Sequence, residues 1–426
     1  MTNNYYSHAH YYAQYVDGLL GAFIIHDPDD PYLNDYDEEY TVILNDWHHT
    51  ESSVLVDWYM SLDSDGDEPM PDIGLINGKN KYNCSLVSEG SQCVDVELEK
   101  FTFVYGKRYR LRIINASAFA AFFFSIDNHY LDVIEVEGTY VERYTVTCIP
   151  INAGQRYSVI VTADQEISNY WMRSAFHMGF YSSRPSTLEV YNKAIIHYEG
   201  ADGVDPETGS WDDSTMLDWW DLDQLVDLKP YYFEPLPENT HTLVLALACT
   251  DDDNEVSMAL VNGSSFTPDY NASTLDRVYN RIQEYDSRQN IYSFIYYGQV
   301  VDVIIINYDG GEHPFHMHSH KFWVIGSERF FTDYGISPEN LNFVDPIQRD
   351  TVTVPEAGWA IIRFIVDSPG VWAFHCHIEW HVEAGLVAQF VELPDMIAQM
   401  NPPEEWKNLC KNQTTTITNQ DTSFSL

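Results

Sequence analysis

The sequence predicts an all-β protein built from more than one β-sandwich or β-barrel domain. Short alternating or apolar runs recur along the chain, and each is bounded by Gly, Pro, Asn or Asp. Aromatic residues make up 15% of the chain, and long amphipathic helical patterns are few. A chain of 426 residues is also too long for one hydrophobic core. These observations together favour two or three domains of short antiparallel strands.

The expected strands follow from these runs in chain order. We expect them at residues 21–27, 40–47, 108–115, 122–127, 156–163, 241–248, 301–308, 359–366 and 387–393. The segment 200–237 differs, because it is acidic and contains proline, and we expect an interdomain connection there. The last residues, 411–426, form a polar tail.

The charge balance limits the possible partners. The chain has 22 Lys and Arg against 65 Asp and Glu, a formal net charge of −43. Nucleic acid is excluded as a partner, because phosphate binding needs a basic surface. High solubility explains such a charge, and attraction of a cationic substrate is the alternative that charge alone does not support.

The cysteines and the glycosylation sequons bear on whether the protein is secreted. Cys84 and Cys93 lie nine positions apart in a polar segment, and we expect a local disulfide that is worth roughly 2–3 kcal/mol. Cys410 has no obvious partner. No apolar run is long enough for a transmembrane helix, and no signal peptide is visible after Met1. Five Asn-x-Ser/Thr sequons modestly favour a secreted glycoprotein, and they begin at Asn83, Asn115, Asn262, Asn271 and Asn412.

Histidines are concentrated in three His-x-His segments. They read SHAH (His8 and His10), HPFHMHSH (His313, His316, His318 and His320) and HCHIEWH (His375, His377 and His381). Strand side chains alternate, so Cys376 points away from its flanking histidines, which suits two metal sites on opposite faces of one strand. Buried core histidines are the alternative interpretation. Zinc fits poorly, because structural zinc prefers four closely spaced Cys and His ligands.

One thiolate and two imidazoles make a blue-copper electron-transfer site. Cys376, His381 and His313 fit that donor set. The axial position falls near Leu386, which cannot be a ligand, so the site would be three-coordinate with a raised potential. A plain core leucine would look the same in sequence.

Several of these segments resemble the motifs of multicopper oxidases. HPFHMHSH and HCHIEWHVEAGL resemble the two C-terminal copper motifs, and SHAHYYAQYVDGL resembles the second N-terminal motif. The resemblance extends over nearly the whole chain and is greatest to fungal laccases and ferroxidases. It implies tandem cupredoxin domains, which are Greek-key β-sandwiches, and four coppers that pass electrons from a reductant to O2.

The resemblance also implies a role for each histidine. Type 1 copper would take His313, Cys376 and His381. Type 2 copper would take His316. One type 3 copper would take His10, His318 and His375, and the other His8 and His377. His320 would be no ligand. Glu379 would supply protons, with an ordinary carboxylate beside the ligands as the alternative.

One family motif, HWHG, is absent from the sequence. We therefore expect a chain that begins inside the first cupredoxin domain, which would also leave Cys410 unpaired. The expected domains are residues 1–40, the end of domain 1; 41–199, domain 2; and 238–410, domain 3.

The substrate is less well indicated. Asp309 and Asp127 fall at positions that resemble iron-binding acids of ferroxidases, although both also suit ordinary loops and turns. Thr147 stands where many laccases carry a substrate-contacting acid, whereas membrane-type ferroxidases carry a C-terminal anchor that is absent here. We expect an extracellular, monomeric, laccase-like oxidase of phenols that reduces O2. A ferroxidase and a copper-binding fragment with impaired O2 reduction are the alternatives.

Overall fold

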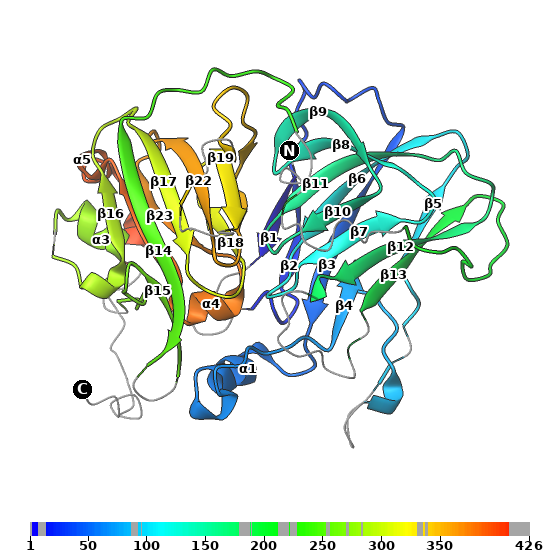
Figure 1. The fold of residues 1–426 in the computed structure, drawn as a ribbon, viewed down its shortest axis with the longest axis horizontal. Coiled ribbons are helices and arrows are strands. Elements are labelled where there is room, and N and C mark those ends of the chain that lie inside the picture. The colour runs from blue at the N-terminus through cyan, green and yellow to red at the C-terminus, as the bar shows by residue number, and fades with distance from the viewer. Residues whose placement is uncertain are drawn as a thin grey trace.

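The structure is a computed structural model. It describes residues 2–6, 14–86, 93–94, 96–178, 188, 190–211, 221, 228–252, 256–269, 272–282, 284–329, 335–336 and 340–408. Figure 1 shows two β-sandwiches side by side, with the second half of the chain in one and the first half in the other. The expected all-β fold is therefore confirmed.

The first sandwich contains the strands between residues 38 and 198. One sheet has the order β4-β3-β6-β11-β8-β9 and the other β10-β7-β12-β13-β5. Their bounds are β3 Glu38–Trp47, β4 Ile73–Ile76, β5 Lys100–Phe103, β6 Arg108–Asn115, β7 Phe122–Ile126, β8 Leu131–Val136, β9 Thr139–Val146, β10 Cys148–Ile151, β11 Arg156–Thr162, β12 Asn169–Phe176 and β13 Tyr191–Tyr198. Apolar side chains from both sheets fill one core between them.

The second sandwich contains the strands between residues 241 and 392. Its sheets have the orders β15-β14-β17-β22-β19-β20 and β16-β24-β23-β18-β21. Their bounds are β14 His241–Asp251, β15 Ser257–Val261, β16 Ile291–Phe294, β17 Val300–Asn307, β18 His313–Met317, β19 Phe322–Arg329, β20 Gln348–Arg349, β21 Thr351–Val354, β22 Gly358–Ile365, β23 Gly370–Cys376 and β24 Val387–Glu392.

The remaining elements are short. β1 (Thr2–Tyr6) and β2 (Leu20–Ile24) form a separate two-stranded sheet. The helices are α1 Ser52–Tyr59, α3 Thr274–Tyr279, α4 Glu379–Glu383, α5 Pro394–Ile397 and α6 Glu404–Asn408, with 3-10 turns at Leu62–Ser64, Cys84–Leu86 and Ser287–Gln289. None of the helices in the described part of the chain has the length and apolar composition needed to cross a membrane.

Local sequence patterns located these elements well. Each of the nine expected strand segments contains a strand, because alternating β-branched and aromatic residues suit a sheet with one buried face. Cys84 and Cys93 form the expected disulfide. Cys410 and the polar tail lie outside the described residues. The exact domain boundaries stay a prediction.

Buried ion pairs join the two sandwiches. The guanidinium of Arg156, on β11, donates to both carboxylate oxygens of Asp350 at 2.7 and 2.6 Å. Arg349, on β20, donates to Glu137 at 2.8 Å, and both side chains are fully buried. Moving one sandwich relative to the other would separate these pairs and leave buried charges uncompensated. The pairs therefore hold the two sandwiches in one relative position. That position matters because the histidines lie near this interface.

Candidate metal centre

The pairing of β18 with β23 places the histidine and cysteine side chains on two opposite faces of one sheet. Phe315 lies opposite Cys376, and His316 lies opposite His375. Because successive strand residues point to opposite faces, His313 shares the face of Phe315 and Cys376, which is the core face. His316 and His375 point to the other face. One pair of strands therefore separates the donors into two groups, as the alternation in the sequence predicts.

The first group consists of His313, Cys376 and His381. Nδ1 of His381 lies 3.2 Å from the Cys376 Sγ atom, Nδ1 of His313 lies 3.8 Å from it, and the two Nδ1 atoms are 2.9 Å apart. The short helix α4 carries His381 back over the end of β23. All three side chains are buried. One sulfur and two imidazole nitrogens thus converge on a common point, which is the donor set that suits blue copper.

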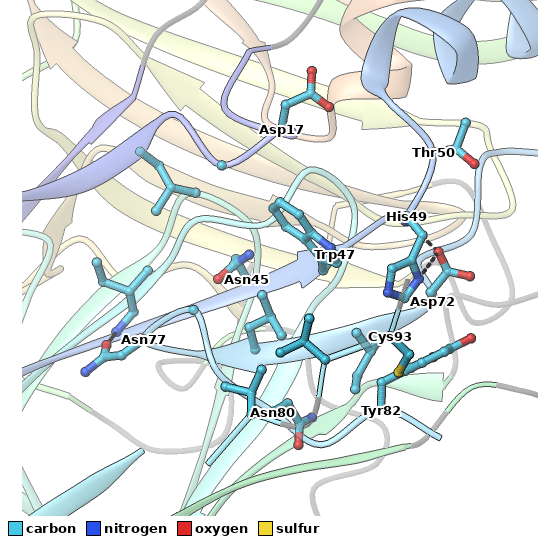
Figure 2. Close-up of a pocket in the computed structure, with 18 of the residues that line it drawn as sticks. Asp17, Asn45, Trp47, His49, Thr50, Asp72, Asn77, Asn80, Tyr82 and Cys93 are labelled. Atoms are coloured by element: carbon cyan, nitrogen blue, oxygen red, sulfur yellow. Dashed lines mark hydrogen bonds and ion pairs between the residues drawn. The ribbon is translucent and has the colours of Figure 1, made fainter. Parts of the chain in front are cut away.

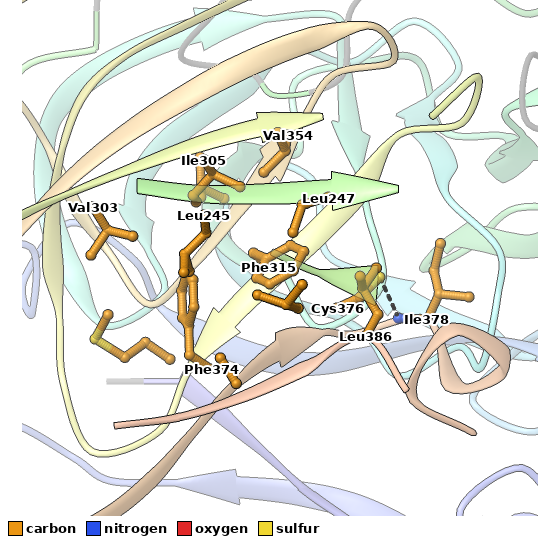
Figure 3. Close-up of a cluster of buried hydrophobic side chains, with 14 of the residues drawn as sticks. Leu245, Leu247, Val303, Ile305, Phe315, Val354, Phe374, Cys376, Ile378 and Leu386 are labelled. Carbon is orange, nitrogen blue, oxygen red and sulfur yellow. Dashed lines mark hydrogen bonds between the residues drawn. The ribbon is translucent and has the colours of Figure 1, made fainter. Parts of the chain in front are cut away.

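An apolar shell surrounds this first group. Figure 3 shows Leu386, Phe315 and Ile378 around Cys376, whose Sγ accepts a hydrogen bond from the Ile378 backbone at 3.5 Å. Leu386 is completely buried and offers no donor atom. Burial raises the pKa of Cys376, but His381 and His313 outweigh it and lower the pKa to about 7. The thiol therefore loses its proton readily, as a metal ligand must.

Two carboxylates contact the outer nitrogens of these histidines. Oε1 of Glu68 lies 2.5 Å from Nε2 of His381, and Oδ2 of Asp309 lies 3.3 Å from Nε2 of His313. Burial raises the pKa of Asp309, but His313 outweighs it and holds the pKa at about 2, so Asp309 is ionised. Sequence reasoning found Asp309 and missed Glu68. The sequence feature that contains Glu68 is the acidic run DSDGDE before β4. Such runs are common on protein surfaces, so this one does not indicate a metal site by itself.

Both carboxylates line a cavity of about 560 Å³. Its lining includes both of them and His381, so the first group borders the cavity. Further acids line the same cavity, namely Asp65, Asp67, Asp251 and Glu312. A cavity wall of this composition attracts cations and repels anions.

The second group consists of four histidines on the opposite face. Nε2 of His318 and Nε2 of His375 are 3.1 Å apart. The ring of His316 lies 5.1 Å from that of His318 and 5.8 Å from that of His377. Hydrogen bonds hold one ring nitrogen of two of these histidines. Nδ1 of His375 contacts the Cys376 carbonyl at 2.7 Å, and Nδ1 of His316 contacts the Asp350 carbonyl at 2.9 Å. A hydrogen bond at Nδ1 fixes the tautomer of the ring and leaves Nε2 to bind a metal ion.

The other predicted residues are placed as follows. His8 and His10 lie outside the described residues. Asp127 is not brought to either group: it is fully buried and accepts two hydrogen bonds from Arg173 at 2.7 and 2.8 Å. Glu379 begins α4 and accepts a hydrogen bond from the Tyr15 hydroxyl at 3.0 Å. Burial, and then the charge of Glu383, raises the pKa of Glu379 to about 8.

A larger cavity, of about 1150 Å³, lies elsewhere on the molecule. Figure 2 shows Trp47, Tyr82 and an ion pair of His49 with Asp72 in its wall. Nδ1 of His49 lies 3.0 Å from the Asp72 carboxylate. Of the predicted site residues that the structure describes, none lines this cavity.

Comparison with known proteins agrees with this geometry. Multicopper oxidase sequence profiles match residues 38–201 and 256–396. The chain is 34% identical to the iron transport multicopper oxidase fio1 of Schizosaccharomyces pombe over 95% of its own length, and it spans 63% of that protein. A laccase of Phlebia radiata is 35% identical, with 95% of this chain and 74% of that protein covered.

The fold gives the same result. The crystal structure of a laccase from Botrytis aclada superimposes with a TM-score of 0.86 at 28% identity, covering 98% of this chain and 75% of that one. The expected cupredoxin-type sandwiches are thereby confirmed. With two profile matches, a relative at 35% identity and a Cys-His donor set of the kind that binds copper, this chain belongs to the multicopper oxidase family.

Proposed function

We propose that this chain is the copper-binding part of an oxidase that takes electrons from Fe(II) and delivers them to O2. Among reductants, Fe(II) fits the cavity better than the phenols that the sequence led us to expect. The observation that carries the proposal is the pair of carboxylates, Glu68 and Asp309, on the outer nitrogens of His381 and His313. Hard divalent cations prefer such oxygen ligands.

The residues present suit the coppers of the family. His313, Cys376 and His381 would hold one copper, because their donor atoms lie within 4.8 Å of one another. His316, His318, His375 and His377 would hold the others, together with His8 and His10. When bound, copper supplies a one-electron acceptor beside the cavity and a cluster at which O2 is reduced to water.

The side chains of the cavity would bind and orient the iron. Glu68 and Asp309 each offer a carboxylate to the cation, and the second oxygen of each keeps its imidazole in place. Electrons would then leave iron toward His381 and His313 over hydrogen-bond distances. His375, Cys376 and His377 are consecutive residues, so a bonded route joins the two donor groups.

Glu379 is the proposed proton carrier of the second group. It lies two residues after His377, is buried, and is oriented by the Tyr15 hydroxyl. A carboxyl in that position would hold a proton close to the site where O2 is reduced and pass it on through Oε1 or Oε2.

Phenol oxidation is less well supported by this cavity. The described lining offers Tyr59, Phe119 and Ile378 to an aromatic ring, but six carboxyl groups lie in the same wall and favour a cation over a neutral ring. The named laccase relatives nevertheless make a phenol the proper comparison substrate. The experiment therefore measures both substrates on the same protein.

The test compares kcat/KM for Fe(II) and for a diphenol in wild type, Glu68→Ala, Asp309→Ala and the double variant. Each carboxylate contact to a cation is worth about 1.5–3 kcal/mol, so each loss should lower kcat/KM for Fe(II) about 10-fold to 100-fold. The diphenol value should fall by less than about 3-fold, since a neutral ring gains little from the carboxylates. Asp67→Ala is the matched control, because Asp67 lines the same cavity without contacting either histidine nitrogen in the contacts described here.

Copper content and the blue absorption of each variant would show that the metal sites remain filled. Equal losses for Fe(II) and the diphenol would reject iron as the preferred reductant and return the phenol interpretation to first place.

A further inference from the structure

We propose that the turn between β10 and β11 of the first sandwich positions two histidines of the second donor group, which lies on the second sandwich. Gly154 and Arg156 are the positioning residues, and His377 and His316 are the imidazoles that they hold in place. The inference rests on the proposed copper-binding role of the second donor group. It does not depend on which reductant the acidic cavity takes.

The turn, residues 152–155, is buried at the boundary between the two sandwiches. Two internal hydrogen bonds define its shape: the Asn152 amide donates to Oε1 of Gln155 at 2.8 Å, and the Gln155 amide donates to the Asn152 carbonyl at 3.1 Å. Across the boundary, Nδ2 of Asn152 donates to Oγ1 of Thr353, on β21, at 3.2 Å. β21 pairs with β18, the strand of His316. Hydrogen bonds therefore join the turn to the sheet that carries the second donor group.

Gly154 lies directly against the ring of His377. Its φ is +80°, and a Cβ atom on this residue would lie 2.4 Å from Cδ2 and 2.8 Å from Nε2 of His377. Carbon atoms that are not bonded to each other prefer a separation of about 3.5–4.0 Å. His377 is buried, and its amide donates to the Pro314 carbonyl at 2.6 Å, so the ring would have to move rather than the backbone. Only glycine at position 154 leaves the imidazole where it is.

Arg156 acts on His316 through Asp350. Besides its two bonds to the Asp350 carboxylate, the guanidinium donates to the Gly154 carbonyl at 2.9 Å. The same carboxylate accepts a hydrogen bond from the Thr351 hydroxyl at 2.9 Å, and that hydroxyl lies 3.0 Å from Nδ1 of His316. The Asp350 carbonyl is the other contact of Nδ1. One guanidinium thus fixes both the glycine beside His377 and the groups that orient His316.

The size of the displacement decides the consequence for metal binding. Relief of a 2.4 Å contact needs a shift of about 1 Å, whereas the ligands of a metal site must be held within about 0.5 Å. Replacing Gly154 should therefore weaken copper binding at the second donor group. The first donor group lies on the opposite face of β23 and has no contact with the turn among the described residues, so it should keep its copper.

The test measures the copper affinity of each donor group by competition with a chelator in wild type, Gly154→Ala and Arg156→Lys. Electron paramagnetic resonance follows both groups in one sample, because thiolate ligation gives the blue copper a signal of its own. Each substitution should lower the affinity of the second group about 10-fold to 100-fold, the usual loss when a residue that orients a ligand is replaced. Lysine keeps the charge of Arg156 but not its paired hydrogen bonds. The blue absorption should stay at the wild-type level, which also shows that each variant is folded.

Two substitutions serve as matched controls. Gly106→Ala introduces the same backbone strain, since Gly106 has a φ of +87°, but a Cβ atom there meets no other atom within 4 Å. Arg173→Lys breaks another paired contact of an arginine with an aspartate, Asp127, within the same sandwich. Both controls should keep the wild-type copper affinity at the second donor group.

An unchanged affinity in Gly154→Ala or in Arg156→Lys would overturn the role of that residue. Equal copper loss from both donor groups, or equal loss in the control variants, would assign the effect to general instability and overturn the inference as a whole. Selective loss from the second group in a protein that does not prefer Fe(II) to a diphenol would confirm the positioning role and reject only the proposed reductant.

Discussion

At the scale of single residues, one side chain beside the first donor group should affect the reduction potential of the copper bound there. His313, Cys376 and His381 supply two nitrogens and one sulfur, and the neighbouring Leu386 supplies none. A thioether at this position would add a weak axial donor, which stabilises Cu(II) relative to Cu(I). Leu386 should therefore contribute to a high reduction potential.

Leu386→Met should lower the potential of the blue copper, since methionine fills a similar volume and brings a sulfur atom. A shift of about 60 mV changes a one-electron equilibrium tenfold, and we expect a decrease of that order. Redox titration of the blue absorption measures it. Leu245→Met is the control: Figure 3 shows Leu245 in the same core but away from Cys376. A potential that stays the same or rises in Leu386→Met would contradict an axial role for this position.

At the scale of elements, the end of β3 holds the loop between β6 and β7, and this loop contacts the start of α4. The carboxylate of Asp46 accepts hydrogen bonds from the backbone amides of Ala118, Phe119 and Ala120 at 2.9, 2.8 and 2.9 Å. The carbonyl of Ala118 in turn accepts from the Glu379 amide at 2.8 Å. One buried side chain of the first sandwich thus fixes a loop that positions the first residue of α4.

Asp46→Ala should lower the free energy of unfolding by about 3–5 kcal/mol, because three buried amides lose a charged acceptor. Chemical denaturation monitored by tryptophan fluorescence measures the change. Asp57→Ala, an exposed site on α1, should change stability by less than about 0.5 kcal/mol. Equal effects of the two substitutions would show that the Asp46 hydrogen bonds contribute nothing.

At the scale of the whole molecule, buried ion pairs make stability depend on pH. Arg110, on β6, is fully buried and contacts Asp30 and Glu135. Burial raises the pKa of Glu135, but Arg110 outweighs it and lowers the pKa to about 2 from an ordinary value of 4.5. A depressed carboxyl pKa stabilises the folded state above the unfolded pKa, and this stability is lost as pH falls toward the folded value.

The free energy of unfolding should therefore decrease as the pH is lowered from 4.5 to 2, by about 3 kcal/mol for Glu135 alone. Glu135→Gln should be less stable at pH 7 and should flatten this part of the profile. Asp395→Asn, at an exposed pair with Arg281, should leave the profile unchanged. Denaturation curves between pH 2 and 7 give both comparisons. A profile equally steep in Glu135→Gln would assign the pH dependence to other groups.

The sequence by itself determined the strands, the Cys84–Cys93 disulfide and the division of the histidines into two groups. These features are local: strand alternation acts between neighbouring residues, and the disulfide closes a short loop. Cys376 and its flanking histidines could be assigned to opposite faces without any knowledge of the fold.

Only the tertiary structure decided which carboxylates contact the histidines of the first donor group. Glu68 contacts His381, although the two residues are far apart in sequence. Asp127, whose position alone suggested iron binding, is instead buried against Arg173. Such contacts depend on how the two sandwiches and their loops pack together. Packing is a property of the whole chain, and no local pattern of residues records it.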